Sequence, residues 1–471
     1  MKRFIDRERE LAALNEQYAA DGASFVVIYG RRRVGKTTLI KEFMKDKKAL
    51  FYLAKEELES DSMKRFAETL ADYTGQEYLK NANFERWQDL FDVFIKHDQK
   101  EKKVLIIDEL PCLVDINPAF PGILKWCWDE KLQDENFMLI LSGSLVNMME
   151  KHALNYNSPL YGRRTGQIKL KQIDFMHYDK FYEGMPYRDL VEHYAVTGGV
   201  PRYIELFDPK KALFDEVSRL MLTSDGLLFE EPEFLLRHEV EEIGSYFSII
   251  RSIAAGNHRP SKISADIGVK QTSLPKYLKT LMDLDILERE VPVTENNPEK
   301  SKTSLYRIKD NYLRFWFRFV YPERGRLELG LSDYVLERIK ANFIDNHVAY
   351  IYKTVCRSEL WRLAIAGAAR FNKLGRWWNS KAEIDIVALD SAGDDILFAE
   401  CKYRNQMLDT DVFYDLLEKK DLVMWKNGKR KERFVLFSIS GFTERLRALA
   451  KCRDDLLLFG GDGKLEDFLS E

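Results

Sequence analysis

The first third of the chain alternates short apolar runs with stretches of helical periodicity. The apolar runs have the length of strands and cover about 24–29, 49–54, 103–108 and 137–142. Before the first run, Leu11, Leu14 and Tyr18 recur at helical spacing, which predicts an amphipathic helix over residues 7–20. Strands that alternate with helices are typical of a parallel sheet covered on both faces. The pattern therefore predicts an α/β domain over residues 1–155.

The rest of the chain shows three further patterns. Residues 156–238 have mainly helical periodicity and are expected to form a helical lid. Residues 239–325 predict three helices closed by a β-hairpin, which is the order of elements in a winged helix-turn-helix. The polar stretch TENNPEKSKT separates the two hairpin strands, as expected for the tip of a wing. Residues 335–471 predict one more small α/β domain.

Composition and charge narrow the class of protein. The 471 residues are 45% hydrophobic and 32% charged, which is typical of a folded chain with several domains and excludes a mostly disordered one. The net charge of −3 gives no overall basic surface, so any contact with nucleic acid must come from local patches. No apolar run reaches the length of a membrane span, and the amino terminus is charged. The five cysteines form no Cys-x-x-Cys pair, so we expect reduced thiols and a cytoplasmic protein without membrane contact.

A phosphate-binding loop follows the first predicted strand. Residues 30–37 fit the pattern G-x-x-x-x-G-K-[ST], in which glycines let the backbone N–H groups surround the phosphates of a nucleotide. The helix that begins at Lys36 directs its positive amino-terminal end at the same anion. The alternative is a glycine-rich turn without a ligand. The pattern predicts an ATP site made of Gly30, Arg31, Arg32, Arg33, Val34, Gly35, Lys36, Thr37 and Thr38.

Two adjacent carboxylates end the third predicted strand, KVLIID. Asp108 is expected to hold Mg²⁺ together with the Thr37 hydroxyl, and Glu109 to orient and polarise the attacking water. Lys36 would contact the β- and γ-phosphates. Charged pairs at strand ends are common in α/β proteins, and the prediction depends on the phosphate loop upstream. ATP and Mg²⁺ are the cofactors that these residues imply.

Positive charge gathers in the predicted winged helix. A helix placed in a major groove would present Thr272, Ser273 and Lys276 to DNA. The candidate DNA-contact residues are Lys262, Thr272, Ser273, Lys276 and Lys279. Winged helices also act as spacers or as protein-contact modules, and that alternative stays open. The aromatic run YLRFWFRFVYP that follows could stack on bases, but its density of Phe and Trp favours a core.

A second acidic cluster lies near the carboxyl end of the chain. Glu383 and Asp385 would share one face of a strand, and Glu400 and Lys402 one face of the next. If these strands are neighbours, Asp385 and Glu400 could bind Mg²⁺ while Lys402 positions water, which is the chemistry of a metal-dependent phosphodiesterase. The alternative is a pair of amphipathic strands with solvated charges.

Several motifs together resemble the archaeal-type ATPase family, a group related to STAND and AAA ATPases. They are RFIDREREL, GRRRVGKTTL, LIIDELPCLV, LILSGSLVNMM, SPLYGRRTGQI and TGGVPRYIELF. The downstream stretches WFRFVYP and GRWWNSKAEIDIVAL…FAECKY resemble the domain that accompanies this ATPase, which is similar to PD-(D/E)XK nucleases. Proteins of that fold commonly carry a further acidic residue on the preceding helix, where this chain has Lys353.

The resemblance also implies roles for residues outside the phosphate loop. It implies that residues 4–7, from Phe4 to Arg7, pack near the adenine and that Ser142 and Ser144 sense the γ-phosphate. Arg163 would act as an arginine finger, in cis or from a neighbouring subunit, and Arg202 would carry the lid's contact to the nucleotide. For both arginines a surface salt bridge is the alternative.

The leading hypothesis is an ATPase that couples nucleotide state to a winged helix and a nuclease-like domain acting on DNA. The expected partners are ATP, ADP and DNA, with a homo-oligomer as a further possibility. One rival is a STAND-like signalling ATPase whose C-terminal domain is inactive and binds a partner. The other is a nucleic-acid-binding module without useful hydrolysis.

Overall fold

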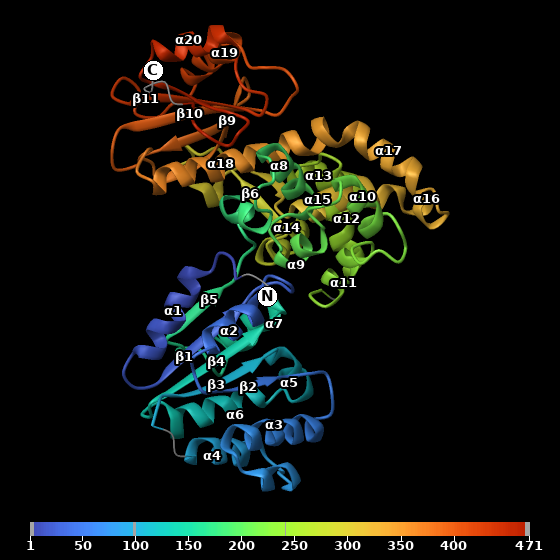
Figure 1. Cartoon of the computed structure of the whole chain (residues 1–471), viewed down its shortest axis with the longest axis vertical. Coiled ribbons are helices and arrows are strands. Elements are labelled where there is room, and N and C mark those ends of the chain that lie inside the picture. Colours follow the sequence, from blue (N-terminus) through green and yellow to red (C-terminus); the bar gives the residue numbers. More distant parts are fainter. Residues whose placement is uncertain (1–3, 98–99, 241, 467–471) are drawn as a thin grey trace. The chain divides into compact units, whose positions relative to one another are not determined.

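The computed structural model describes residues 4–97, 100–240 and 242–466 and divides into two compact units. The first unit comprises residues up to 172 together with 235–240, and the second comprises residues 173–234 and those from 242 onward (Figure 1). The first unit thus extends past residue 155, the expected boundary, because a fifth strand completes its sheet. Most of the predicted lid (residues 173–234), the winged-helix stretch from residue 242 and the C-terminal domain lie within the second unit, whereas residues 156–172 and 235–240 belong to the first.

The first unit is built on a five-stranded parallel sheet, in which the four predicted strands are joined by a fifth that the sequence did not predict. Its strands follow the order β2-β3-β4-β1-β5. Their bounds are β1 (Ser24–Tyr29), β2 (Ala49–Leu53), β3 (Lys103–Asp108), β4 (Phe137–Gly143) and β5 (Gly166–Lys169). Every residue of β1 and β4 is buried, which agrees with central strands covered on both faces. β4 lies between β1 and β3, so the phosphate loop and the acidic strand leave the sheet from non-adjacent strands.

Helices cover both faces of this sheet (Figure 1). They are α1 (Glu8–Ala19), α2 (Lys36–Met44), α3 (Glu59–Thr74), α4 (Trp87–Lys96), α5 (Leu110–Ile116), α6 (Phe120–Cys127) and α7 (Val146–Met149). On one face, Leu14 of α1 and Leu39 of α2 share an apolar cluster with Ile106 of β3. On the other, Phe94 of α4 and Leu124 of α6 surround a small apolar hollow with other side chains.

The second unit begins with helices. They are α8 (Tyr187–Thr197), α9 (Pro201–Leu206), α10 (Leu213–Met221) and α11 (Glu231–Arg237), followed by α12 (Ile243–Ala254), α13 (Pro260–Ile267) and α14 (Leu274–Asp283). Strands β6 (Leu287–Glu290) and β7 (Leu305–Ile308) then pair in antiparallel fashion. Three helices followed by a two-stranded sheet is the element order that the sequence predicted for this stretch.

The aromatic stretch after β7 belongs to the core. It forms α15 (Asn311–Phe315) and a π-helical turn (Trp316–Val320), in which Tyr312, Phe315 and Trp316 are fully buried. The expectation of a core is therefore confirmed. Three helices continue the chain, namely α16 (Arg324–Glu328), α17 (Ser332–Phe343) and α18 (Ala349–Ile365).

A second five-stranded sheet, of mixed direction, closes the unit. Its order is β12-β11-β10-β9-β8, with β8 (Lys373–Trp378), β9 (Glu383–Leu389), β10 (Asp395–Lys402), β11 (Lys431–Ser438) and β12 (Leu456–Phe459). β9 runs antiparallel to both of its neighbours, β8 and β10. β11 runs parallel to both of its neighbours, β10 and β12. Helices α19 (Thr410–Lys420) and α20 (Glu444–Lys451) pack with it, and Phe398, Phe413 and Phe434 lie in its apolar core.

The β6–β7 hairpin is tied to the C-terminal sheet. The Glu290 carboxylate at the end of β6 accepts ion pairs from Arg307 of β7 at 2.6 Å, Arg357 of α18 at 3.0 Å and Arg376 of β8 at 3.5 Å. Just after β6, Val293 N–H donates to the Arg376 carbonyl at 2.9 Å, and the Val293 side chain joins the core of the sheet. Backbone, ion-pair and apolar contacts therefore all join the hairpin to the sheet.

In residues 4–466, leaving aside 98–99 and 241, none of the helices combines the length and apolarity needed to cross a bilayer.

Candidate functional site

The phosphate loop joins β1 to α2 in a conformation that its glycines permit. Gly30 has φ +149°, and a Cβ there would lie 2.3 Å from the Leu170 carbonyl oxygen. Gly35 precedes α2 with φ +99°, in a region that L side chains rarely adopt. A side chain at either position would therefore disturb the loop that presents Lys36.

Lys36 is buried at the start of α2. Its Nζ donates to the Gly30 carbonyl at 2.7 Å and to the Arg31 carbonyl at 3.0 Å. Burial lowers the pKa of Lys36 to about 8, although the nearby carboxylates of Glu109 and Asp108 oppose the shift. The loop thus holds a desolvated ammonium group by hydrogen bonds to main-chain carbonyls. Among the described residues this group has no direct carboxylate partner, so an anionic ligand could pair with it.

Thr37 and Asp108 are in contact at the ends of their elements. The Thr37 hydroxyl donates to Asp108 Oδ2 at 2.8 Å, and Asp108 Oδ1 accepts the backbone N–H of Glu109 at 3.1 Å. Asp108 is fully buried at the end of β3. A hydroxyl and a carboxylate that already share a hydrogen bond suit the oxygen coordination that Mg²⁺ prefers, so these residues fit a magnesium ion.

Glu109 has a left-handed backbone conformation, with φ 58° and ψ 49°. This region costs a residue with a side chain about 1–2 kcal/mol, so the surrounding fold must hold it there. The carboxylate points to the end of β4, where Glu109 Oε2 accepts the Ser144 N–H at 3.0 Å and the Ser144 hydroxyl at 2.8 Å. Ser144, predicted as a γ-phosphate sensor, thus contacts Glu109 here.

The remaining predicted nucleotide residues of the first unit lie around this loop. Arg7 Nη2 donates to the Val34 carbonyl at 3.4 Å and to the Lys171 carbonyl at 2.5 Å, while Phe4 packs at the edge of the apolar core. The Ser142 hydroxyl is fully buried and has no hydrogen-bond partner among the described residues. Within the loop, Arg31 is buried, whereas Arg32, Arg33 and Thr38 are exposed.

The two predicted arginines outside the loop form ion pairs. Arg163 makes a bidentate pair with Asp129, at 2.6 Å and 2.7 Å, and this bond raises the Arg163 pKa. Arg202 belongs to the second unit and lies 3.9 Å from Glu205. The surface salt bridge considered as the alternative is thus present for both, and the roles in nucleotide contact stay predictions.

Glu239 joins the ATP site although no motif singles it out. Its Oε1 accepts the Val146 N–H at 3.2 Å, its main-chain carbonyl accepts Asn147 Nδ2 at 3.0 Å, and its Oε2 is buried without a hydrogen-bond partner among the described residues. Burial raises the pKa of Glu239 to about 7, against the attraction of Arg31 and Lys36. Residues 173–234 belong to the second unit, and the chain then returns to the first unit with Glu239. Because Glu239 is so far from the phosphate loop in sequence, its position near the loop could not be predicted from spacing.

The predicted DNA-contact residues are accessible. Lys262 lies on α13, Lys276 and Lys279 lie on α14, and Thr272 and Ser273 precede α14; all five are exposed. Their assignment to DNA contact stays a prediction.

The C-terminal carboxylates lie on adjacent strands, as expected. Asp385 is on β9 and Glu400 on β10, and they are 4% and 3% exposed. The pairing of Ile386 with Ala399 places the two carboxylates at the same end of this antiparallel pair. Asp385 Oδ2 accepts the backbone N–H of Cys401 at 3.1 Å.

Lysines, however, surround this pair of carboxylates. Lys353 from α18 forms an ion pair with Asp385 and lies 3.7 Å from Glu383. Glu400 accepts Lys402 at Oε2 and Lys419 of α19 at Oε1, each at 3.0 Å. Sequence reasoning identified Lys353 as unusual but missed Lys419, because only the fold brings α19 against β10.

The lysines shape the titration of the two carboxyl groups. Burial would raise the pKa of Asp385, but the charge and hydrogen bond of Lys353 outweigh it and lower the pKa. Burial and the negative charge of Asp385 raise the pKa of Glu400, against Lys402 and Lys419. For Lys353 and Lys402, burial lowers the pKa, and the carboxylates they contact more than compensate.

This arrangement does not fit a divalent cation as it stands. The Lys353 ammonium group forms an ion pair with Asp385, and each carboxylate oxygen of Glu400 already accepts a hydrogen bond from a lysine. Throughout the part of the chain that the structure describes, no group of three or more His, Cys, Asp or Glu side chains is arranged to hold a metal. Metal-dependent hydrolysis at Asp385 and Glu400 therefore has no support in this arrangement.

Two protein families match separate parts of the chain. A family described as an "ATPase domain predominantly from Archaea" matches residues 4–207, and one described as "Archaea bacterial proteins of unknown function" matches residues 316–419. Among solved structures, the Walker-type ATPase PABY2304 of Pyrococcus abyssi aligns with a TM-score of 0.51 at 20% identity. The alignment covers 67% of this chain and 96% of that one, and at this identity it supports the fold alone.

Two proteins of Methanocaldococcus jannaschii are related in sequence. "Uncharacterized protein MJECL04" is 36% identical over 426 residues, which cover 89% of this chain and 92% of that protein. "Uncharacterized ATP-binding protein MJ0423" is 47% identical over 45 residues, which cover 10% of this chain and 76% of its own length. The chain therefore belongs to the archaeal-type ATPase family and carries that family's ATPase domain together with its C-terminal domain.

Proposed function

We propose that this protein hydrolyses ATP with Mg²⁺ and uses the nucleotide state to control a second unit that contacts DNA. The observation that carries the proposal is the set of contacts at the phosphate loop. Lys36 lies on loop carbonyls, Thr37 contacts Asp108, and Glu109 is held by Ser144. A phosphate ligand, a cation site and a water-activating carboxylate thus occur together in one site.

Each residue has a role that follows from its contacts. Lys36 would exchange its bonds to neutral loop carbonyls for bonds to phosphate oxygens, since a phosphate acceptor adds an opposite charge. Thr37 and Asp108 would hold Mg²⁺, which when bound neutralises phosphate charge. Glu109 would release Ser144 and accept a proton from the attacking water.

DNA contact would come from the exposed residues of α13 and α14. Lysines near a phosphate backbone release counterions on binding, so affinity should fall as salt is added. Replacing Lys262, Lys276 and Lys279 by Gln should weaken DNA binding and reduce the slope of log affinity against log salt by about 2–3. A matched control replaces the exposed Lys340, Lys381 and Lys429, which lie on other elements.

The experiment is ATP turnover by the full chain with and without duplex DNA. DNA should stimulate turnover by the parent and by the control triple variant, and not by the α13/α14 triple variant. Equal stimulation of both variants, or a binding constant that does not respond to salt, would contradict DNA contact by these helices while leaving ATP hydrolysis intact.

A second candidate function is a STAND-like regulatory ATPase whose C-terminal domain binds a partner without cleaving nucleic acid. The ion pair of Lys353 with Asp385 favours this regulatory function, because the ammonium group takes the place of a metal cation. Incubating labelled DNA with the protein, ATP and Mg²⁺ or Mn²⁺ separates the two functions. Cleavage that disappears in Asp385→Ala supports a nuclease, whereas intact DNA supports the regulatory alternative.

A further inference from the structure

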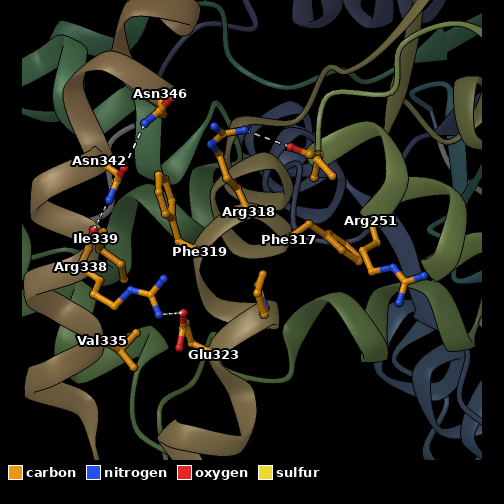
Figure 2. Close-up of a pocket in the computed structure, with 13 residues that line it drawn as sticks. Arg251, Phe317, Arg318, Phe319, Glu323, Val335, Arg338, Ile339, Asn342 and Asn346 are labelled. Atoms are coloured by element: carbon orange, nitrogen blue, oxygen red, sulfur yellow. Dashed lines mark hydrogen bonds and ion pairs between the residues drawn. The ribbon is translucent and has the colours of Figure 1, made fainter. Parts of the chain in front are cut away.

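The second unit contains a hollow of about 380 Å³ that the proposed function does not use. It lies between α12, the π-helical turn Trp316–Val320 and α17 (Figure 2). A volume of this size is within the range of small-molecule sites in proteins. Its lining combines cationic, amide and aromatic side chains.

Cationic side chains outnumber acidic ones around the hollow. Arg251 comes from α12, Arg318 from the π-helical turn and Arg338 from α17, against one carboxylate, that of Glu323. Glu323 is already neutralised, since it accepts Arg338 at 2.5 Å and also pairs with Arg326. The side chains that line the hollow therefore carry a net positive charge.

Arg318 is the side chain that makes this charge unusual. It is half-buried, and its Nη1 donates a hydrogen bond to the Ala254 carbonyl at 3.0 Å, drawn as a dashed line in Figure 2. In the described part of the chain neither Arg318 nor Arg251 has an ion-pair partner. Burial alone lowers the pKa of Arg318. A desolvated cation without a counter-ion destabilises a fold, so a ligand that supplies the negative charge would explain its presence.

Uncharged groups complete the lining. Asn342 lies on α17 and Asn346 on the π-helical turn (Ile344–Val348) that continues it, and Asn346 Nδ2 donates to Asn342 Oδ1 at 3.2 Å. In Figure 2 they face the turn that carries Phe319, beside Val335 and Ile339. An apolar wall beside amide groups suits the planar or ring portion of an organic ligand.

We propose that this hollow binds a small phosphorylated molecule of mononucleotide size, with its phosphate on Arg318. The guanidinium group can donate two parallel hydrogen bonds to phosphate oxygens, and Arg251 adds positive charge at the rim. The site is distinct from the phosphate loop, which lies in the other unit, and does not depend on the proposed action on DNA. A half-buried arginine in a hollow of this size suits a small ligand better than a duplex backbone, which needs an extended exposed surface.

The test measures binding of AMP, adenosine and inorganic pyrophosphate by titration calorimetry. The full chain carries Lys36→Ala in every variant, so that the phosphate loop contributes no binding. AMP and pyrophosphate should bind saturably at millimolar concentrations, and adenosine should bind about 10-fold more weakly than AMP or not at all. Arg318→Gln should weaken AMP by about 10-fold or more, and Arg251→Gln by about 3-fold.

Lys340→Gln is the matched control, because it removes one positive charge from the exposed surface of the same helix, α17. It should leave AMP binding unchanged. Melting of each variant without ligand checks the fold, and Arg318→Gln should melt no lower than its parent because it removes an uncompensated charge. If Arg318→Gln does not fold, Arg251→Gln decides.

Two results would overturn the proposal. One is the absence of saturable binding of both AMP and pyrophosphate, or binding that Arg318→Gln and Arg251→Gln leave unchanged. The other is displacement of AMP by duplex DNA with the same dependence on Arg318, which would make the hollow part of a nucleic-acid surface.

Discussion

The phosphate-loop site and the C-terminal carboxylate pair use the same residue types and reach opposite arrangements. Each combines two strand-end carboxylates with lysine. In the first, Lys36 is bonded to main-chain carbonyls, and the carboxylates of Asp108 and Glu109 are bonded to hydroxyl and N–H groups. In the second, Lys353 pairs with Asp385, and Lys402 and Lys419 both bond to Glu400.

The difference shows that the neighbours of a carboxylate decide whether a cation can bind. A hydroxyl or N–H group leaves the negative charge of the carboxylate available, whereas an ammonium group neutralises it. Removing the ammonium group alone would leave a buried charge without a partner. The first site is therefore open to a metal and a nucleotide, and the second is filled by the protein's own cations.

The largest effect is expected at Lys36. Lys36→Ala removes the ammonium group that would pair with the phosphates, so ATP turnover should fall by about 1,000-fold and nucleotide binding should be lost. Lys41→Ala, an exposed lysine on the same helix, is the control. Turnover and calorimetric titration measure the outcome, and parental turnover in Lys36→Ala would refute the site.

Replacing Glu109 distinguishes ATP binding from ATP hydrolysis at the phosphate-loop site. Glu109→Gln keeps the shape of the side chain but cannot accept the proton of water, so turnover should fall by about 100-fold or more while ATP still binds. Glu130→Gln, an exposed carboxylate of the same unit, should leave turnover unchanged. An unchanged rate in Glu109→Gln would favour a nucleic-acid-binding protein without useful hydrolysis.

Replacing Lys353 would make the Asp385/Glu400 pair resemble a metal-binding site. Lys353→Glu adds a carboxylate next to Asp385 and removes its counter-ion, which should lower the free energy of unfolding by about 3 kcal/mol without metal. Mn²⁺ should restore much of this loss, as seen by thermal melting with and without the ion. Parental protein and the exposed control Lys381→Glu should not respond, and a parental response to Mn²⁺ would show that Lys353 does not exclude cations.

A smaller effect concerns Glu239 and pH. Phosphates brought near this carboxylate would raise its pKa further above about 7, so the nucleotide complex would hold more protons than the free protein. Affinity for ATP should then be greatest at pH 6 and fall by up to about 10-fold toward pH 8. Calorimetry across this range should show a flatter profile for Glu239→Gln, in which only other groups near the loop, Lys36 among them, still titrate. Identical profiles would remove Glu239 from the site.

Local patterns predicted much of the first unit. Apolar runs gave the strands from Ser24 to Gly143 nearly to the residue, because buried parallel strands are continuously apolar. β5 was missed since Gly166–Lys169 is short and only half-buried. Thr37 of the phosphate-loop motif and Asp108 at the end of the acidic strand were expected at one Mg²⁺ site, and they are in contact.

Contacts between distant segments were harder to predict. Glu239 follows the loop by about 200 residues and approaches it through a hydrogen bond to Val146, which no periodicity encodes. Lys419 was not singled out in the sequence, because its bond to Glu400 depends on how α19 packs on β10. Side-chain partners of this kind arise from tertiary packing, whereas strands and loops arise from local sequence.

The three arginines on Glu290 have a mechanical consequence. Since they come from the hairpin, from α18 and from the sheet edge, bending between these parts would break several ion pairs at once. The hairpin and the mixed sheet should therefore turn as one rigid body. If the helices before the hairpin contact a duplex, a movement of the hairpin would be passed on to the sheet that carries Asp385.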